Sequence, residues 1–355
     1  MLMTSFATEY PQLLLAQGVL VGLGFGCLYV PSVAIAASYF STRRALALGL
    51  TSTGGSVSEY HRVITTSIAD NLTGGVIYVI AFRRLQPRIG FGWATRVIAL
   101  IALITLAANL VVTKTRTKPG PARNLLELSA FKSVPYSLFT AGAFVALIGL
   151  YFPYFYIPVY SERIVGTSAD FAFYLLAVVN AASFFGRIVP NLLADKVGSL
   201  NVLIPCTFVT AALSMAWVDI KSVGGIVAFT ILYGFFSGTF LSLLPTVIAS
   251  LSPDPRSYDT RMGMSFGIGS FGILIGNPIA GKLLNVAEGK FNAAQYFAAS
   301  MMFGGAVLLA VCRFAIFFQN GNRRDTLKMR LSKWPRPKPY RPQGGYLSNH
   351  SIRSQ

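Results

Sequence analysis

Residues 226–251 read IVAFTILYGFFSGTFLSLLPTVIASL and contain no Asp, Glu, Lys or Arg. A helix of about 20 apolar residues is long enough to cross the hydrocarbon core of a bilayer. A barrel strand needs only about 10 residues of alternating character, whereas this stretch is apolar all round, which favours a helix. Residues 13–37 and 139–159 have the same character. These stretches predict an all-α, polytopic membrane protein.

The composition of the whole chain agrees with this fold class. Of its 355 residues, 54% are hydrophobic and 12% are charged, whereas soluble domains carry roughly 25% charged residues. A net charge of +18 would suggest nucleic acid in a soluble protein, but here Lys and Arg stand between and after the apolar runs. That distribution is typical of segments retained beside anionic lipid. We therefore expect a lipid bilayer as partner and no nucleic acid.

Metal and cofactor chemistry has few candidate ligands in this sequence. Cys27, Cys206 and Cys312 lie inside apolar runs, and neither His61 nor His350 has a Cys or a second His at ligand spacing. A membrane-bound transferase would need an intramembrane His, an Asp-rich diphosphate motif or a metal cluster, and none is visible. The sequence therefore predicts no metal, no cofactor and no enzyme.

Apolar runs between polar breaks predict nine membrane spans. The predicted spans are 13–38, 45–57 continuing brokenly into 74–82, 93–113, 136–159, 169–193, 200–218, 225–251, 263–286 and 294–318. Basic residues in 114–134 and in 320–355 place both segments in the cytoplasm, which puts the N-terminus outside. The arginines of residues 83–96 then fall outside as well, so the charge rule supports this topology imperfectly.

The spans divide the chain into four regions. We expect a partial N-terminal bundle over residues 1–113, interrupted at 58–73, and a cytoplasmic inter-bundle loop over 114–134. A six-helix C-terminal bundle would follow over 135–319. Residues 320–355 hold four prolines among basic residues and have little apolar surface to bury, which predicts a disordered cytoplasmic tail.

Three short strings resemble one family of transporters. Residues 39–50, YFSTRRALALGL, resemble the second signature of the monocarboxylate porter family of the major facilitator superfamily. Residues 17–22, QGVLVG, and 84–93, RLQPRIGFGW, look like its fungal branch, which includes a riboflavin transporter. The match in hydrophobic layout extends from residue 4 to about residue 320. The resemblance implies a fold of twelve helices in two bundles.

The resemblance also implies that the chain starts just before the fourth helix of that fold. The acidic-Gly-aromatic motif that opens the first helix in the family is absent. Residues 58–73 interrupt the expected fifth helix with Glu59, His61, Arg62 and Asp70. Such groups at membrane depth would cost several kcal/mol without partners. The interruption is interpreted either as a retained intron or as a genuine extracellular or re-entrant loop.

The function implied by the resemblance is secondary active transport of a small organic solute. Two bundles would rock about a central site in alternating access. A monocarboxylate, riboflavin and a fungal secondary metabolite are all open as substrates, and truncation would impair transport. The alternative is a non-transporting membrane sensor or scaffold, or an inactive fragment. We expect the plasma membrane as the location, with the vacuole as the alternative.

Arg187 is the first candidate for substrate binding. It lies inside the predicted span 169–193, where a guanidinium is costly unless it faces a wet cavity, and it can bind a carboxylate through two hydrogen bonds. The resemblance agrees, because monocarboxylate porters use an arginine on this helix. Ser183 stands where those porters carry an acidic partner, so coupling to protons is open. Alternatively, Arg187 extends toward the cytoplasm and pairs with Asp195.

Aromatic and hydroxyl side chains on two other spans could line the same cavity. The tyrosines of residues 151–156 could stack a flat ligand, or they could belong to an interfacial aromatic belt. Residues 233–242 repeat polar groups near helical spacing, with packing as the alternative. The predicted substrate-binding residues are Arg187, Asn180, Ser183, Tyr151, Tyr154, Tyr233, Ser237 and Ser242.

Two turns are candidates for gates. Residues 191–198, NLLADKVG, look like the superfamily's short turn between its eighth and ninth helices. Asp195 can cap the next helix and accept from a basic residue, while Gly198 permits the tight turn. Arg43 and Arg44 would be the equivalent gate in the first half, or plain positive residues retained inside.

Overall fold

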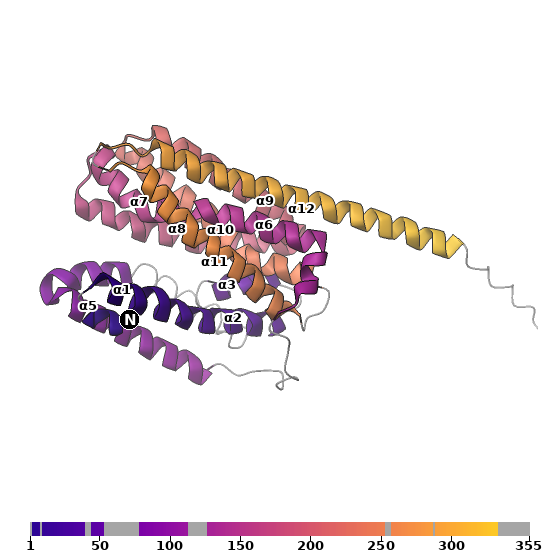
Figure 1. The fold of residues 1–355 in the computed structure, drawn as a ribbon, viewed down its shortest axis with the longest axis horizontal. Coiled ribbons are helices and arrows are strands. Elements are labelled where there is room, and N and C mark those ends of the chain that lie inside the picture. Colours follow the sequence, from indigo (N-terminus) through magenta and orange to yellow (C-terminus); the bar gives the residue numbers. More distant parts are fainter. Residues whose placement is uncertain are drawn as a thin grey trace, which may run out of the picture. The chain divides into compact units, whose positions relative to one another are not determined.

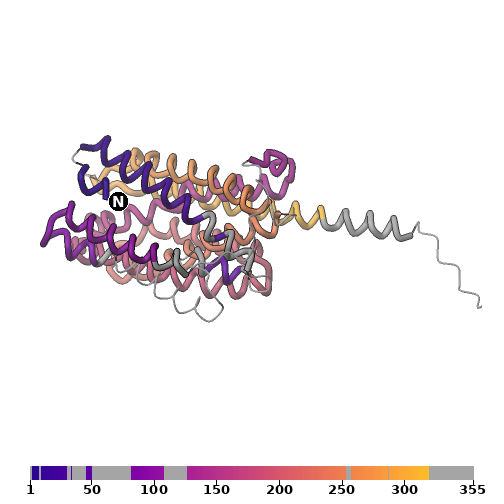
Figure 2. The backbone as a smooth tube through the Cα atoms, turned by 90° about the horizontal axis from the view of Figure 1, so that it is seen from below, coloured from indigo at the N-terminus to yellow at the C-terminus, as the bar shows by residue number. Residues whose placement is uncertain are grey.

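The structure is a computed structural model, and it describes residues 2–7, 9–39, 44–52, 78–112, 126–252, 257–286 and 288–332. Within these residues every regular element is a helix, apart from an isolated β-bridge between Asn285 and Lys290. The long helices up to Ala315 run side by side in both views of the backbone (Figures 1 and 2). The predicted all-α fold class is confirmed.

Six helical elements lie in the described residues of the first part of the chain, up to Val112. They are η1 (Met3–Phe6), α1 (Tyr10–Leu13), the π-helix η2 (Leu14–Leu20), α2 (Val21–Tyr39), α3 (Arg44–Ser52) and α5 (Tyr78–Val112).

The second part begins within the inter-bundle segment, at η4. Its elements are η4 (Leu128–Lys132), α6 (Val134–Leu150), α7 (Phe152–Tyr160), η5 (Ser161–Val165), α8 (Ala169–Val197), α9 (Ser199–Ala216), η6 (Trp217–Asp219), α10 (Val223–Leu251), α11 (Tyr258–Leu283) and α12 (Asn292–Ser332).

Eight helical segments of the described chain are long and apolar enough to cross a membrane. They are Tyr10–Tyr29, Ala81–Ala107, Val134–Val165, Ala169–Val197, Ser199–Asp219, Val223–Leu251, Tyr258–Leu283 and Asn292–Gln319. The predicted second span is described only at its start, as the nine residues of α3, so the structure does not test it. Residues 53–77, including the predicted interruption at 58–73, lie outside the described residues.

The connection expected before the predicted span 93–113 is a kink in α5. The helix runs from Tyr78 to Val112 and turns at Gly90, which has φ 77° and ψ 166°. Only glycine adopts such a positive φ without steric strain, so the chain changes direction there without a loop. The helix that follows the turn therefore begins within a few residues of position 93, where the predicted span starts.

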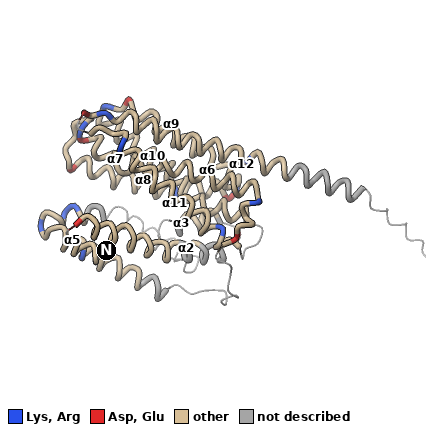
Figure 3. The backbone as a smooth tube through the Cα atoms, viewed as in Figure 1, with Lys and Arg blue, Asp and Glu red and all other residues tan. Residues whose placement is uncertain are grey.

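Charged residues gather toward the two ends of the helices, and the stretches of backbone between them are largely uncharged (Figure 3). A charge in the hydrocarbon core is costly, so a membrane protein places its ion pairs near the interfaces. Burial differs between the two parts. In the most apolar stretches of Tyr10–Tyr29 and Ala81–Ala107, only 6% and 11% of residues are buried, against 28% to 61% in the other six spans. The buried core therefore belongs mainly to the C-terminal part.

An aromatic cluster fills one end of this core. Trp217 is fully buried and stacks on Phe229, with ring centroids 5.2 Å apart. Phe152 and Tyr160 pack against the same indole at 5.5 Å and 5.2 Å. Elsewhere α8 and α10 approach closely, since a Cβ atom at Gly238 would lie only 2.6 Å from the carbonyl oxygen of Ser183. These contacts fix α8 against α10 and so position the polar side chains between them.

The end of the chain differs from the predicted tail. Contacts divide the molecule into Met1–Ala315 and Ile316–Gln355, and α12 continues to Ser332. Residues 320–332 are therefore helical, where disorder was expected from residue 320. The physical reason is that all four tail prolines follow residue 334, so no proline interrupts α12 before its end. Residues 333–355 lie outside the described residues.

Candidate functional site

A hydrogen-bonded pair joins α7 to α10 inside the C-terminal part. The hydroxyl of Tyr154 lies 2.9 Å from Oγ of Ser237, which is fully buried. The ring of Tyr154 packs edge-on against Tyr233 at 6.0 Å. Tyr233 is also fully buried, and its hydroxyl donates to the carbonyl oxygen of Leu150 at 2.6 Å. Two phenols and a serine hydroxyl thus lie together within membrane-spanning segments.

Further side chains extend this group toward α2 and α8. The ring of Tyr151 lies 5.8 Å from that of Tyr154, and its phenol interacts electrostatically with Arg187 on α8 and Tyr29 on α2. Tyr29 in turn makes an edge contact with Phe266 on α11 at 5.7 Å. We call Tyr29, Tyr151, Tyr154, Tyr233 and Ser237 the tyrosine cluster.

The tyrosine cluster offers two kinds of interaction. Its hydroxyls can donate and accept hydrogen bonds without a net charge, and its rings can stack on a flat solute. The nearby guanidinium of Arg187 can bind an anionic oxygen. This arrangement suits an organic molecule with a flat apolar body and a polar or acidic group.

The remaining predicted binding residues make contacts within α8 or between α8 and α10. Asn180 donates to the carbonyl oxygen of Leu176 in its own helix at 2.8 Å. Ser183 is buried against Gly238. Ser242 accepts from Nδ2 of Asn191 at 2.7 Å and ties α10 to α8. The structure thus brings Tyr151, Tyr154, Tyr233 and Ser237 together, with Arg187 nearby, and places Asn180, Ser183 and Ser242 in helix packing.

Tyr29 was missed by the sequence reasoning. It is a single tyrosine in the otherwise apolar first span, and nothing in its neighbours signals a site. Only the packing of α2 against α11 brings it toward Tyr151.

Asp195 caps a helix, but a different one from that expected. Its carboxylate accepts hydrogen bonds from the backbone N–H groups of Ala45 at 2.8 Å and Leu46 at 3.1 Å, at the start of α3. The free N–H groups and positive dipole end of a helix attract such a carboxylate. The next helix, α9, instead begins at Gly198 without a side-chain cap, and Gly198 makes the turn with φ 102°. The gate candidate Arg43 and the side chain of Arg44 lie outside the described residues.

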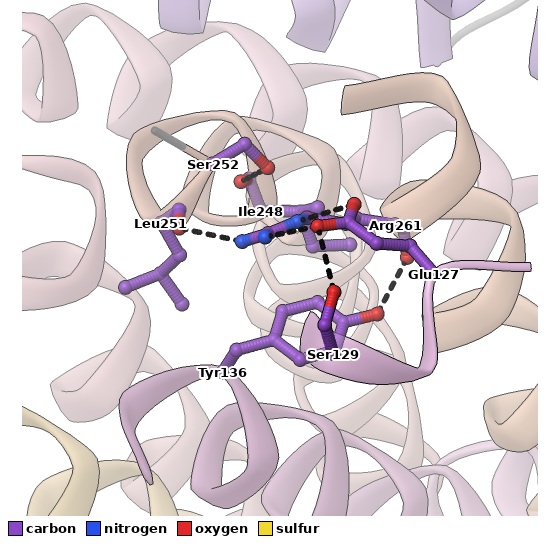
Figure 4. A network of polar contacts seen from close by, with 7 residues as sticks. All are labelled: Glu127, Ser129, Tyr136, Ile248, Leu251, Ser252 and Arg261. Carbon is purple, nitrogen blue, oxygen red and sulfur yellow. Dashed lines mark hydrogen bonds and ion pairs between the residues drawn. The ribbon is translucent and has the colours of Figure 1, made fainter. Parts of the chain in front are cut away.

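A second polar network lies where the inter-bundle segment meets α11 (Figure 4). Arg261 donates to both carboxylate oxygens of Glu127, at 2.7 Å and 3.0 Å. Its guanidinium also lies 5.7 Å from the ring centre of Tyr136, whose hydroxyl donates to the Arg261 carbonyl oxygen at 2.8 Å. The hydrogen bonds from Arg261 hold the pKa of Glu127 below its ordinary value. Glu127 was missed, although it is the one acidic residue in 114–134.

Two hollows lie outside the tyrosine cluster. One is an apolar surface groove of about 640 Å³ between residues 126–131 and α11, and the other, of about 210 Å³, lies between Thr4, Gln17 and Thr95. Among the described residues, no group of three His, Cys, Asp or Glu side chains could hold a metal ion. The tyrosine cluster therefore remains the best candidate site.

Comparison with known sequences identifies the family. A profile described as Major Facilitator Superfamily matches residues 1–220 and 191–349. The chain is 39% identical to the MFS-type transporter dbaD of Emericella nidulans over 80% of its length and 60% of that protein. It is 36% identical to the aspyridones efflux protein apdF of the same organism, over 86% of this chain and 59% of that protein. The agnestins efflux protein AgnL12 of Paecilomyces divaricatus is 33% identical, over 88% and 68%.

The chain thus spans about 60% of the length of dbaD and of apdF. Solved structures show the same fold at low identity. The transporter FucP in its outward conformation aligns with a TM-score of 0.62 and 16% identity, over 88% of this chain and 78% of FucP. The human organic anion transporter MFSD10 aligns with a TM-score of 0.62 and 13% identity, over 86% and 73%. This multi-pass membrane chain belongs to the major facilitator superfamily.

Proposed function

We propose that this chain serves transport of a small organic solute across a membrane by alternating access. Membership of the superfamily and relatives that are named transporters support the proposal. Two relatives are named as efflux proteins, which favours export as the direction and the plasma membrane as the location. The moving bodies would be the bundles of residues 1–113 and 135–319, joined by the loop 114–134.

The observation that carries the proposal is the tyrosine cluster. Hydroxyls within spans, such as those of the half-buried Tyr154 and the buried Ser237, are costly in lipid unless they are paired or face a solute path. Tyr29 comes from the first part of the chain, and the other members come from α7, from Tyr151 directly before it, and from α10. A site built from both parts is what alternating access requires, because the solute must meet both moving bodies.

The subfamily, the chemical class of the solute and the coupling to protons are also proposals. Residues 39–50 and the position of Arg187 support membership of the monocarboxylate porter family. Arg187 then favours a solute with a carboxylate or another acidic oxygen. Ser183 stands at the family's acidic position and packs against Gly238. Any coupling to protons would therefore use a different group.

Binding and transport by the full chain test the proposal. The purified chain in nanodiscs is screened with flat organic acids by thermal shift, and transport is followed in proteoliposomes. We expect Tyr154→Phe to weaken binding of an active compound about fivefold to tenfold, because one hydrogen bond is lost. Tyr296→Phe is the matched control, since Tyr296 is 47% exposed on α12 and lies outside the cluster. Equal affinity in both variants would refute the site.

A further inference from the structure

The smaller of the two hollows lies between Tyr10–Tyr29 and Ala81–Ala107, the two least buried of the eight candidate spans. It has a volume of about 210 Å³. Its walls combine three side chains with hydrogen-bonding groups, Thr4, Gln17 and Thr95, and four apolar ones, Val21, Phe82, Phe91 and Ile98. None of the described residues that line it is charged. The function proposed above makes no use of this hollow.

The hydroxyl of Thr4 is the polar group that points to a ligand. Thr4, in η1, is only 3% exposed, and within the described part of the chain its hydroxyl has no hydrogen-bond partner. Such a buried hydroxyl is costly, and most of its kind in proteins are paired. Thr95 donates its hydroxyl to the carbonyl oxygen of Phe91 at 2.8 Å, which leaves the hydroxyl oxygen able to accept. The hollow therefore offers a donor at Thr4 and an acceptor at Thr95.

The backbone departs from the regular α-helix on both sides of this hollow. Gln17 is the middle residue of η2, a π-helix of seven residues. π-helices are rare, and they frequently occur at functional sites. On the other span the chain turns at Gly90, and the rings of Phe82 and Phe91, on either side of that turn, make an edge contact at 5.9 Å. Both departures shape the walls between which a ligand would lie.

The charged residue next to Thr95 is already engaged elsewhere. Nε of Arg96 donates to Oγ of Ser5 at 3.1 Å, and the guanidinium lies 4.5 Å and 4.8 Å from the ring centres of Phe6 and Trp93. Cation–π contacts of this kind are attractive. They hold η1, and Thr4 with it, against α5. The hollow itself thus keeps only uncharged hydrogen-bonding groups, which favours an uncharged ligand.

Size and depth narrow the class of ligand. At about 30 Å³ per water the hollow has room for several molecules, but a buried water needs two to four polar partners, and the apolar walls supply none. An apolar ring that carries one hydroxyl would satisfy both kinds of wall. Gln17 lies seven positions into its span and Thr95 five positions after the turn at Gly90, or about 10 Å and 8 Å along a helix. Half of the hydrocarbon core is about 15 Å, so the hollow lies near one face of the membrane.

We propose that this hollow binds the hydroxyl end of an uncharged alcohol with an apolar ring. Thr4 donates to the oxygen of the alcohol, and the alcohol donates to Thr95 or to the side-chain oxygen of Gln17. The ring packs against Phe82 and Phe91. A sterol of the bilayer and a phenol from water present this same chemistry. The site lies outside the tyrosine cluster, so the inference does not depend on whether the protein transports.

Hydrogen exchange of the full chain in nanodiscs tests the site with two probes, cholesterol and 4-ethylphenol. Their methyl ethers, cholesteryl methyl ether and 4-ethylanisole, are the controls because the hydroxyl is capped. We expect at least one alcohol to slow exchange in residues 2–7 and 14–20 roughly twofold to fivefold, and its ether to have no effect. Protection by cholesterol assigns the bilayer as the source, and protection by 4-ethylphenol alone assigns water. If neither alcohol protects, or if the ethers protect equally, the proposal is overturned.

Substitution of Thr4 separates binding from a structural role. Thr4→Val removes the hydroxyl and keeps the shape, so it should weaken binding of the active alcohol about fivefold to tenfold. Without a ligand it should melt no lower than the wild type, because the protein loses no hydrogen bond of its own. Thr105→Val is the matched control on α5. Thr105 lies outside the hollow, and its hydroxyl donates to the carbonyl oxygens of Ile101 and Ala102 in the same helix.

Equal affinity of Thr4→Val and Thr105→Val for the alcohol would overturn the proposal. If Thr4→Val melts below the wild type, Gln17→Met decides, because it removes the amide at similar side-chain length. Weaker binding by Gln17→Met then supports the site, and unchanged binding overturns it.

Discussion

Asp170 and Asp195, 25 positions apart on α8, bind segments from opposite sides of residues 53–77. Arg83 follows that stretch, and Ala45 precedes it. The two segments therefore lie about as far apart as 25 helical residues extend. Between Ala45 and Arg83, however, the chain advances by 38 positions. It carries about 13 residues more than a straight helix of that length needs.

Because of these extra residues, we predict that deletion of residues 58–73 stabilises the protein. Without them, Ala45 and Arg83 would be 22 positions apart, close to the 25 positions between Asp170 and Asp195 on α8. We expect the shortened protein to melt several degrees higher in detergent and to elute as a sharper peak, because one continuous helix would replace α3 and the start of α5.

The control for this deletion replaces residues 58–73 with a Gly/Ser segment of equal length, which should bring no gain. A lower melting temperature of the shortened protein would show that the 16 residues are a functional part of the fold. It would thus favour a genuine loop over a retained intron.

Acid should weaken the network of Glu127 with Arg261. The pKa of Glu127 is lowered in the folded protein by its hydrogen bonds from Arg261. The carboxylate therefore stabilises the fold above the pKa of an unfolded glutamate, and this contribution is lost as the pH falls through the lower, folded value. We expect Glu127→Gln to melt below the wild type at pH 7 and to approach it near pH 4.

The free energy of unfolding that the Glu127–Arg261 pair contributes lies between two limits. Exposed pairs contribute up to about 1 kcal/mol, and breaking a buried pair costs about 3 kcal/mol or more. Here the side chain of Arg261 is 9% exposed and that of Glu127 is 27% exposed. Ser129→Ala is the control, because the serine hydroxyl contacts Glu127 only at 3.4 Å. A Glu127→Gln curve parallel to the wild type at all pH values would contradict the prediction.

Uninterrupted apolar runs made the helices predictable, because a span in lipid must satisfy its backbone hydrogen bonds internally. Turns were harder. The chain turns at Gly90, in a run rich in arginine that was expected to form a longer connection, and this one residue with non-helical φ and ψ separates two helices. The length of α12 beyond residue 320 was underestimated, since the basic composition was weighed more heavily than the absence of proline before residue 335.

Site residues were predictable when they were local and aromatic. Tyr151 and Tyr154 lie one turn apart, and Tyr233 and Ser237 repeat on one helix face, so their grouping follows from helical periodicity. Partners from distant segments could not be foreseen. Asp195 looked like the cap of the next helix because that helix is adjacent in sequence, whereas its true partner, the start of α3, lies 150 positions away. Such pairings depend on tertiary packing, which no local pattern records.

Gly238 should not tolerate a larger side chain. A Cβ atom there would lie 2.6 Å from the carbonyl oxygen of Ser183, which is fixed in α8. We expect Gly238→Ala to destabilise the protein by about 1–3 kcal/mol through this overlap. Gly224→Ala is the matched control on the same helix, because nothing lies within 4 Å of a Cβ atom at that position. Equal melting temperatures of the two variants would mean that α8 and α10 do not pack as closely as described.

The stability of the start of α3 should depend on how well the side chain at position 195 accepts hydrogen bonds. Asparagine is nearly as good an N-cap residue as aspartate, whereas alanine offers no acceptor and costs about 0.5–2 kcal/mol at such a position. We therefore expect exchange of the amide hydrogens in residues 44–52 to rise from wild type to Asp195→Asn and further to Asp195→Ala. The rise should stay local, because Arg83 still holds the other end of α8.

If alanine and asparagine raised exchange equally, loss of the negative charge rather than of the hydrogen bonds to Ala45 and Leu46 would be the cause. The contact would then depend on salt, which a titration of ionic strength would reveal.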